Sequence, residues 1–398
     1  MDCLDNIFAQ PSRRDVLRLS AACGASLALC RARSVFAQDV AGTAELKGPR
    51  LDGVARHEAM FWEKTEQERV KCLLCPRECE VADVERGYCG VRENQGGSYQ
   101  TLVYGSLCSA NLDPIEKKPL FHYLPGTEAF SIATAGCNIE CKFCQNWRIS
   151  QFRPEQVDSV LVTRDRLVSA CKERRSPTIA YTYSEPVVFY EYMRDTAAIA
   201  RDQGVGSVMI SNGYINEKPL RQLCKHLTGV KIDLKAFTEK FYSRSCAGHL
   251  KPVLHTLEVL KDIGIWFEIV VLIIPTLNDS PDEIKRMSEW VVSHLGCDVP
   301  MHFTRFKPTY RLKNFPSTPL STVERCRRIA LDAGVHFAYV GNVPTHEGES
   351  TYCHRCGERL IHRVGWRVEL GKIKDGKCLK CDTRIPGVWS QQQALKRG

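Results

Sequence analysis

The chain has 398 residues, of which 43% are hydrophobic and 25% are charged, as is ordinary for a globular protein. This length allows one large domain or a few smaller ones. The net charge of +9 is spread along the chain without a long block of lysine and arginine, so the composition does not indicate binding to nucleic acid.

Residues 1–38 resemble an export signal. A twin-arginine pair, Arg13-Arg14, precedes a weakly apolar stretch at 19–29 and a small-residue site at Val35-Phe36-Ala37. The apolar stretch is too short for a membrane span. The alternative is a tail in which the arginines are incidental. Residues 39–60 are polar and contain Gly and Pro, so we predict a linker there.

Twenty cysteines are the most unusual feature of the composition. Disulfide frameworks are typical of small secreted domains, whereas eleven of these twenty cysteines fall into three tight groups. Gaps of two or three residues within a group are the spacing of metal or cluster ligands. The groups are Cys72, Cys75, Cys79 and Cys89; Cys137, Cys141 and Cys144; and Cys353, Cys356, Cys378 and Cys381. We expect most of the other nine to be buried as small apolar side chains.

The first group lies in residues 61–128, a predicted N-terminal cysteine-rich segment. Its spacing is C-x2-C-x3-C-x9-C. Four thiolates saturate either a zinc ion or a [4Fe–4S] cluster. Zinc would be a structural clip, whereas a cluster would relay electrons. The spacing leaves both alternatives open.

From about residue 130 strand-like and helix-like segments alternate, which predicts a core domain over 129–345 with an α/β fold. Apolar runs predict strands at 130–134, 178–183, 206–211, 230–234, 266–273, 300–305 and 336–340. Helical periodicity predicts helices at 163–175, 187–202, 216–227, 251–263, 281–295 and 321–333. Repeated β–α units imply parallel strands covered by helices. In a β/α barrel the chemistry lies at the carboxyl ends of such strands.

The second group, Cys137, Cys141 and Cys144, directly follows the first of these strands with the spacing C-x3-C-x2-C. Three thiolates hold a [4Fe–4S] cube by three corners and leave the fourth iron open, whereas most cluster proteins supply four cysteines. Zinc is the alternative, but it normally takes four ligands in a closed site. This spacing, with Phe143 just before the last cysteine, resembles the signature of the radical SAM superfamily.

The resemblance implies a partial (β/α)6 TIM-like barrel, and the strand count agrees with six units plus one extra strand. It implies that S-adenosylmethionine (SAM) binds the open iron and is cleaved by an electron from the cluster. The resulting 5′-deoxyadenosyl radical then removes a hydrogen atom from the substrate. A low-potential electron donor, flavodoxin-like or ferredoxin-like, is implied as a partner.

Polar residues at two later strand ends resemble SAM-binding motifs in relatives of pyruvate formate-lyase activating enzyme. Tyr183-Ser184-Glu185 occupies the place of a Gly-Gly-Glu motif without its glycines, and Ser211-Asn212-Gly213 is similar to Thr-Asn-Gly. The resemblance implies that Glu185 meets the SAM amino group and Asn212 the ribose hydroxyls, with Ser184 and Phe143 also in the SAM site. The ordinary alternatives are a helix N-terminal acid for Glu185 and a turn for Asn212.

The strand at 230–234 ends in Lys231-Ile-Asp233-Leu-Lys235, which is similar to an Asp-Leu-Lys motif of the same family. We predict that Asp233 and Lys235 are catalytic residues facing the reactive cavity. Asp233 would orient the substrate, SAM or a monovalent cation, and Lys235 would reach a carboxylate or handle a proton. His302, at a further strand end, is a candidate for binding an anionic substrate, with a solvated rim as the alternative.

Residues 346–398 form a predicted cysteine-rich tail with the spacing C-x2-C-x21-C-x2-C. Two C-x2-C pairs indicate a zinc ribbon or a rubredoxin-like site. Cys353, Cys356, Cys378 and Cys381 would therefore hold zinc or iron.

Motifs between residues 70 and 389 together resemble the radical SAM enzyme of the AmmeMemoRadiSam system, a group often labelled as pyruvate formate-lyase activating enzyme-like. They include Cys72-Leu-Leu-Cys75-Pro-Arg, Gly341-Asn-Val-Pro344 and Ile385-Pro-Gly-Val-Trp389. The label implies an oxidoreductase that abstracts hydrogen from a glycine Cα of a partner enzyme. The system's name associates the group with Memo-like and AMMECR1-like proteins, and neither name gives the substrate.

We therefore predict a radical SAM enzyme whose substrate is unknown, with a protein as one candidate. Two alternatives stay open: a non-catalytic iron–sulfur protein for electron transfer or metal sensing, and an RNA-modifying radical SAM enzyme that uses its ribbon to bind RNA. Location also stays open. The twin-arginine segment predicts export to the periplasm, whereas the need for SAM and a low-potential reductant favours the cytoplasm.

Overall fold

The computed structural model describes residues 53–343 and 346–396. The predicted export signal at 1–38 and most of the predicted linker lie outside these residues. Among the described residues, no helix is long and apolar enough to cross a membrane.

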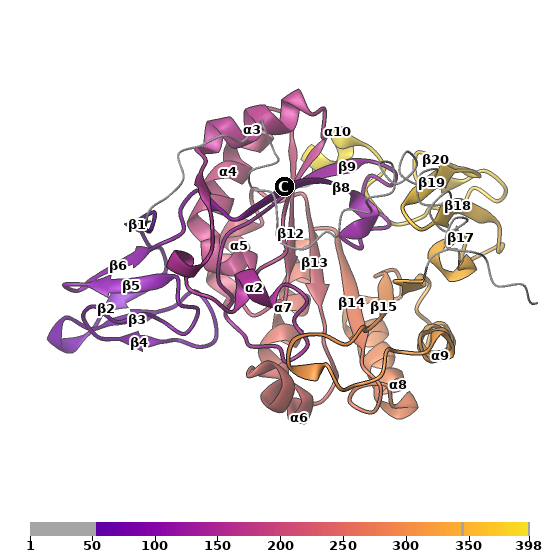
Figure 1. Ribbon diagram of the computed structural model, residues 1–398. Helices are drawn as coiled ribbons and strands as arrows, with labels where there is room; N and C mark the ends of the chain where they lie inside the picture. The colour runs from indigo at the N-terminus through magenta and orange to yellow at the C-terminus, as the bar shows by residue number, and fades with distance from the viewer. Residues whose placement is uncertain (1–52, 344–345, 397–398) are drawn as a thin grey trace, which may run out of the picture. The chain divides into compact units, whose positions relative to one another are not determined.

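A central sheet of eight strands has the order β16-β15-β14-β13-β12-β11-β9-β8 (Figure 1). Seven of them are parallel and match the strands predicted from the sequence: β9 (Glu128–Ala133), β11 (Thr178–Tyr181), β12 (Gly206–Ser211), β13 (Gly229–Asp233), β14 (Phe267–Ile273), β15 (Met301–Arg305) and β16 (Ala338–Gly341). The eighth, β8 (Ser109–Pro114), pairs antiparallel with β9. The predicted α/β fold is confirmed, and within the described residues the sheet is open because β8 and β16 do not pair.

The register of the parallel strands places their carboxyl ends at one edge. Tyr181 pairs with Ile132 and Met209, and Ser211 pairs with Ile232. The segments that follow β9, β11, β12 and β13 therefore meet, and these segments carry the predicted site residues.

Helices connect the parallel strands as the periodicity predicts: α3 (Arg164–Glu173), α4 (Tyr190–Asp202), α5 (Glu217–Leu223), α7 (Leu250–Ile263), α8 (Pro281–Trp290) and α9 (Leu320–Asp332). Local signals fix their ends. Thr163 caps α3 by accepting a hydrogen bond from the Arg166 N–H, and α7 ends at Gly264, whose φ of 77° favours glycine. Helix α8 runs on into a π-helical turn, Val291–Leu295, so the helix predicted over 281–295 is continuous but changes its hydrogen bonding.

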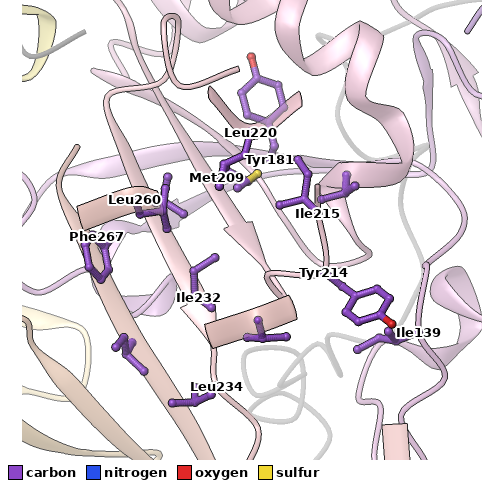
Figure 2. Packing of buried hydrophobic residues seen from close by; sticks show 14 of the residues in the cluster. Ile139, Tyr181, Met209, Tyr214, Ile215, Leu220, Ile232, Leu234, Leu260 and Phe267 are labelled. Atoms are coloured by element: carbon purple, nitrogen blue, oxygen red, sulfur yellow. The ribbon is translucent and has the colours of Figure 1, made fainter. Parts of the chain in front are cut away.

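The core lies between the sheet and these helices (Figure 2). Met209 and Ile232 on the strands pack in one cluster with Leu220 of α5 and Leu260 of α7, all buried. Strands in a parallel sheet are buried along most of their length, which explains why they are continuous apolar runs in the sequence.

The N-terminal cysteine-rich segment forms two small antiparallel sheets. One contains β1 (His57–Glu58), β6 (Ser98–Thr101) and β5 (Arg92–Gln95), and the other contains β2 (Trp62–Lys64), β3 (Val70–Cys72) and β4 (Glu80–Val81). Strand β1 lies inside the predicted linker. Residues 57 and 58 of that linker are therefore part of a sheet, because they pair with β6.

A buried ion pair joins this segment to the core domain. Arg92 Nη2 lies 2.6 Å and 2.7 Å from the two carboxylate oxygens of Glu191 on α4. Both side chains are almost fully buried, with 1% and 2% of their surface exposed. The main apolar core also continues into the segment through Val70 and Tyr99.

The C-terminal segment contains β17 (Thr351–Tyr352), β18 (Arg359–Val364), β19 (Arg367–Leu370), β20 (Ile373–Lys374), β21 (Lys377–Cys378) and α10 (Gln391–Lys396). It shares a small core with Phe121 and Phe337. Arg363 is buried there and donates hydrogen bonds to the Phe121 carbonyl and to Thr351 Oγ1, each at 2.8 Å.

Candidate active site and cysteine clusters

The three cysteines Cys137, Cys141 and Cys144 lie in the loop between β9 and the short helix α2 (Trp147–Ser150). Cys141 is buried, and the other two are half-buried. Gly136 begins the loop with a φ of 102°, and a Cβ there would lie 2.6 Å from Val91 and 3.2 Å from the Cys89 carbonyl oxygen. Glycine therefore allows the loop to pass directly against the N-terminal cysteine-rich segment.

A π-helical turn, Tyr242–Cys246, supports this loop. The backbone N–H of Glu140 donates to the Cys246 carbonyl at 2.8 Å, and that of Lys142 donates to the Ser245 carbonyl at 2.9 Å. A hydrogen bond with the Cys246 thiol, outweighing burial, holds the pKa of Cys141 below its usual value. The expectation that Cys246 is buried is confirmed, but its place beside a predicted ligand was missed.

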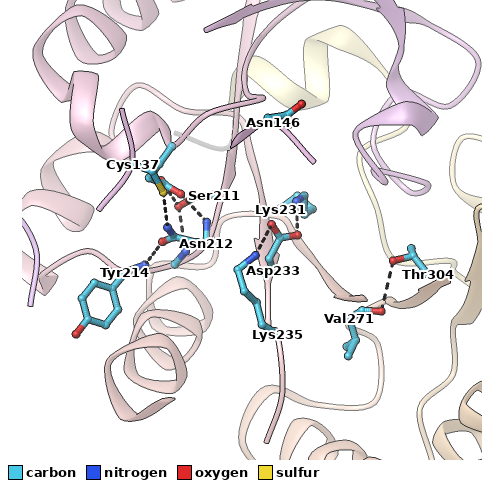
Figure 3. A network of polar contacts seen from close by, with 12 residues as sticks. Cys137, Asn146, Ser211, Asn212, Tyr214, Lys231, Asp233, Lys235, Val271 and Thr304 are labelled. Atoms are coloured by element: carbon cyan, nitrogen blue, oxygen red, sulfur yellow. Dashed lines mark hydrogen bonds and ion pairs between the residues drawn. The ribbon is translucent and has the colours of Figure 1, made fainter. Parts of the chain in front are cut away.

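Asn212, directly after β12, contacts the cysteine loop (Figure 3). Its Nδ2 lies 3.8 Å from Cys137 Sγ and 2.9 Å from Asn138 Oδ1. Its Oδ1 accepts a hydrogen bond from the Tyr214 N–H at 2.8 Å. The contact with Tyr214 is the turn that was the ordinary alternative, so Asn212 both makes a turn and lies next to a predicted cluster ligand.

Glu185, which follows β11, is hydrogen-bonded to the carboxyl end of β12. Its carboxylate accepts hydrogen bonds from Ser211 Oγ at 2.7 Å, from the Asn212 N–H at 2.8 Å and from the Val187 N–H at 3.1 Å. Only 2% of the residue is exposed, and burial raises the pKa of its carboxyl despite these donors. Because the bond from Val187 caps a 3-10 turn, Pro186–Phe189, the helix N-terminal role is real.

Ser184, the neighbour of Glu185, also reaches the cysteine loop. Its Oγ donates a hydrogen bond to the Thr134 carbonyl at 2.7 Å, between β9 and Gly136. The end of β11 is therefore attached both to the cysteine loop and to β12.

Asp233 and Lys235 lie at the end of β13, and the structure brings them together with Lys231 (Figure 3). Asp233 accepts from Lys231 Nζ at 2.5 Å and from Lys235 Nζ at 3.3 Å. Burial opposes the ionisation of Asp233, but the two ammonium groups outweigh it and hold its pKa below the usual value. The Lys235 ammonium lies 5.8 Å from the centre of the Phe143 ring, so this group adjoins the cysteine loop.

The Asp233 carboxylate also determines the protonation state of Lys235. Burial opposes its charge, but the Asp233 carboxylate outweighs burial and raises the pKa of the ammonium well above its usual value. Lys235 therefore keeps its proton near neutral pH, which suits binding of an anionic group.

Several charged residues close to Asp233 or to Tyr183 were not singled out from the sequence. Lys231 could have been, because residues 231 and 233 lie on the same face of one strand. Lys118 and Asp113 could not, because they precede the predicted core domain. Lys118 Nζ lies 2.5 Å from Asp113 and 4.4 Å from the centre of the Tyr183 ring, and burial lowers the pKa of Lys118 to about 8.

His302 does not lie on an exposed rim. It is 1% exposed, and its Nε2 lies 2.7 Å from the carboxylate of Glu268, which is itself fully buried. Glu268 and His302 stand near the amino ends of β14 and β15, opposite the cysteine loop, so the anion-binding role is not supported.

The C-terminal cysteines form a compact set. The sulfurs of Cys353 and Cys381 are 3.6 Å apart, those of Cys356 and Cys378 are 3.7 Å apart, and all four lie within 4.8 Å of one another. Four sulfurs at about 2.3 Å from one tetrahedral ion are about 3.8 Å from each other. The arrangement fits a single bound metal ion.

The N-terminal cysteines are arranged differently. Cys72, Cys75, Cys79 and Cys89 all line one cavity, together with Arg92, Tyr99 and Asn138. Among the described residues their sulfurs are not a set that gathers within 4.8 Å.

Comparison with known proteins gives the family. The model of the radical SAM superfamily matches residues 131–291. An uncharacterised protein of Methanocaldococcus jannaschii is 43% identical over 330 residues, which are 82% of this chain and 98% of that protein. The pyruvate formate-lyase-activating enzyme of Clostridium pasteurianum is 21% identical over 156 residues, 38% of this chain and 65% of that enzyme. The chain belongs to the radical SAM superfamily.

Solved structures also align with the chain. A domain of pyruvate-formate lyase-activating enzyme from Bacteroides vulgatus aligns with a TM-score of 0.37 and 16% identity, over 41% of this chain and 98% of that chain.

Membership of this superfamily implies catalysis with a [4Fe–4S] cluster and SAM, and the residues present fit both. Three thiols occupy one loop, and the Asn212 amide faces one of them. Each ligand of a cube binds a different iron, so the thiols need to stand farther apart than around a single ion. Accordingly, within the described chain Cys137, Cys141 and Cys144 are not among the sets whose sulfurs gather within 4.8 Å.

Proposed function

We propose that this protein is an oxidoreductase that cleaves SAM reductively and removes a hydrogen atom from its substrate, with Cys137, Cys141 and Cys144 as cluster ligands. When bound, the cluster supplies the electron that splits SAM. The observation that carries the proposal is the convergence of Cys137, Asn212 and Glu185, which come from the ends of three adjacent strands. A metal-storage loop would not need this convergence of polar groups.

Asn212 and Glu185 would hold SAM beside the cysteine loop. The Asn212 amide is already directed to the loop, so it can reach a ribose hydroxyl there. Glu185 positions Asn212 through its backbone, and three of the roughly four lone-pair positions of its carboxylate are used. The remaining position suits the SAM ammonium. Ser184 and Phe143 would border the same site.

Asp233 and Lys235 would face the substrate, with Lys231 beside them. A charged lysine pair around one carboxylate leaves a net positive charge, which attracts an anionic group. Asp233 would orient the two ammonium groups, and Lys235, held in its charged form, would bind a carboxylate or phosphate of the substrate.

A protein segment is the substrate that the surface fits best. A groove of about 910 Å³ opens beside Cys137 and is bordered by Phe152, Tyr310 and Arg311. Such a groove admits a peptide loop, as hydrogen abstraction from a partner's Cα requires. The Memo-like and AMMECR1-like proteins of the resembled system are the first candidates, and a flavodoxin-like or ferredoxin-like donor would supply the electron.

The proposal is tested with anaerobically prepared protein, SAM and dithionite. We expect release of 5′-deoxyadenosine and methionine by the wild type and none by Cys141→Ala. Cys326→Ala is the matched control, because Cys326 is a buried cysteine on α9, outside the cysteine groups. Wild-type protein with a full catalytic cluster and no SAM cleavage would instead support the electron-transfer or sensor alternative.

A further inference from the structure

Among the described residues, the sulfurs of the N-terminal cysteines do not gather as four sulfurs around a single ion do. Four sulfurs that share one zinc touch one another and leave no space between them, as the C-terminal set illustrates with separations of 3.6 Å and 3.7 Å. Cys72, Cys75, Cys79 and Cys89 instead line a cavity, and in the described chain no three of their sulfurs lie within 4.8 Å of one another. Four thiolates that each bind a different iron of a cube are spaced more widely than four thiolates that share one ion.

Arg92 supplies an independent observation. Its guanidinium is 1% exposed and lines the same cavity. Nη2 binds Glu191 and Nη1 donates to the Met60 carbonyl, but Nε is buried and finds no acceptor in the described part of the chain. A buried donor without a partner is costly. A cluster sulfide or thiolate in the cavity would accept this hydrogen bond and would be neutralised in part by the arginine.

The cavity directly adjoins the loop of the catalytic cysteines. Asn138, the residue after Cys137, lines it, and Arg77, between Cys75 and Cys79, donates through Nε to the Asn138 carbonyl at 2.5 Å. The Cys89 carbonyl oxygen also lies 3.2 Å from the Cβ position of Gly136. The residues on both sides of Cys137 therefore lie directly against the N-terminal cysteine group.

We propose that Cys72, Cys75, Cys79 and Cys89 hold a second [4Fe–4S] cluster, hydrogen-bonded by Arg92, through which the catalytic cluster receives its electron. A reduced ferredoxin or flavodoxin would give one electron to this cluster, taking it from the 2+ to the 1+ state. The same electron would pass to the catalytic cluster and return the second cluster to 2+. The relay rests on the proposed function, whereas the presence of the second cluster does not.

Acid-labile sulfide tests the cluster, because a lone zinc or iron ion contributes none. We expect about eight sulfides and at least eight irons per chain in anaerobically prepared wild-type protein. The triple variant Cys137→Ser, Cys141→Ser, Cys144→Ser should keep about four sulfides, and Cys72→Ser, Cys75→Ser should lose about four. Cys326→Ser is the control and should lose none.

Zinc in place of the sulfides would overturn the proposal, as would a folded triple variant that keeps no sulfide. If the triple variant does not fold, the wild-type protein still decides, because about four sulfides per chain would overturn the proposal and about eight would support it. The count is independent of SAM cleavage, so failure of the proposed reaction and failure of this inference are distinguishable.

Electron paramagnetic resonance tests the relay. Two reduced clusters that are close enough to exchange an electron also interact magnetically, so the spectrum of the reduced wild type should differ from the sum of the spectra of the two variants. A wild-type spectrum equal to that sum would overturn the relay.

Discussion

The side-chain amide of Asn212 lies 3.8 Å from the sulfur of Cys137, although 75 positions separate the two residues in the sequence. The contact exists because β9 and β12 are parallel and separated only by β11, so their carboxyl ends lie near each other. It connects the loop that would hold the cluster to the strand end that would hold SAM, and it predicts what removal of the amide does.

Asn212→Ala should weaken SAM binding by about tenfold, the size of one or two lost hydrogen bonds to a buried site. Iron and sulfide contents should stay at the wild-type level, because the cysteines remain. Equilibrium dialysis with SAM measures the effect. Asn111→Ala, at an exposed position on β8, is the control. Unchanged affinity for SAM would show that Asn212 only forms a turn.

Cys246→Ala should make the midpoint potential of the catalytic cluster more negative. The Cys246 thiol stabilises negative charge on Cys141 through a hydrogen bond, and hydrogen bonds to cluster sulfurs are one determinant of the potential. A redox titration followed by electron paramagnetic resonance measures it. Cys246→Ser restores a donor and should return the potential toward the wild-type value. Equal potentials in all three proteins would contradict the role of this thiol.

Glu191→Gln should destabilise the protein by about 3–5 kcal/mol, because it leaves the buried Arg92 charge without its carboxylate. Thermal unfolding of matched, fully loaded samples measures the change. Glu289→Gln is the control, since Glu289 pairs with Lys285 on the exposed face of α8 and its loss should have little effect. A Glu191 variant as stable as this control would show that the ion pair does not hold the segment in place.

Glu349→Gln should stabilise the protein at alkaline pH but not at acid pH. Burial raises the pKa of Glu349 from its usual 4.5 to about 7. The stabilisation from proton binding is therefore full below about pH 4.5 and is lost as the pH rises through about 7. At about pH 8.5 the free energy of unfolding of the variant should exceed that of the wild type by about 1–2 kcal/mol. This value allows for solvent, which screens the buried charge and reduces the effect. Unfolding midpoints across this range measure it, and a pH-independent difference would contradict it.

Removal of the C-terminal metal should release the C-terminal segment. Cys353→Ser breaks a set of four sulfurs that we expect to hold one zinc or iron ion. The variant should lose that ion and be cleaved faster by a protease between about residues 350 and 390. Lys377→Ser, an exposed change in the same segment, is the control. A wild-type protein that lacks this ion yet resists the protease would contradict a structural metal site.

The core strands were predictable because each is a buried apolar run in a parallel sheet, and their observed ends differ from the predictions by at most two residues. Strand β8 was not predicted. Its sequence, Ser109–Pro114, is polar and ends in proline, and it becomes a strand only by pairing with β9. Its strand character depends on a partner, which local periodicity does not reveal.

The candidate site also contains residues that local sequence predicts and residues that only the tertiary structure reveals. Cysteine spacing and strand-end motifs predicted Cys137, Glu185, Asn212 and Asp233 as site residues from short stretches of sequence, and the structure brings the first three together. Spacing could not distinguish the compact C-terminal set of sulfurs from the N-terminal set around a cavity, because that difference lies in how the loops fold. Cys246 reaches Cys141 across more than a hundred residues, so only the tertiary structure shows it.

The buried ion pair between Arg92 and Glu191 also affects how the chain is made, because the two partners lie 99 residues apart. During synthesis the N-terminal cysteines and Arg92 leave the ribosome first, while α4 with Glu191 has not yet been translated. A buried arginine without its carboxylate is unfavourable, so the N-terminal segment should remain open until α4 has folded. Insertion of metal or a cluster at Cys72, Cys75, Cys79 and Cys89 would then be completed only after half of the core domain exists.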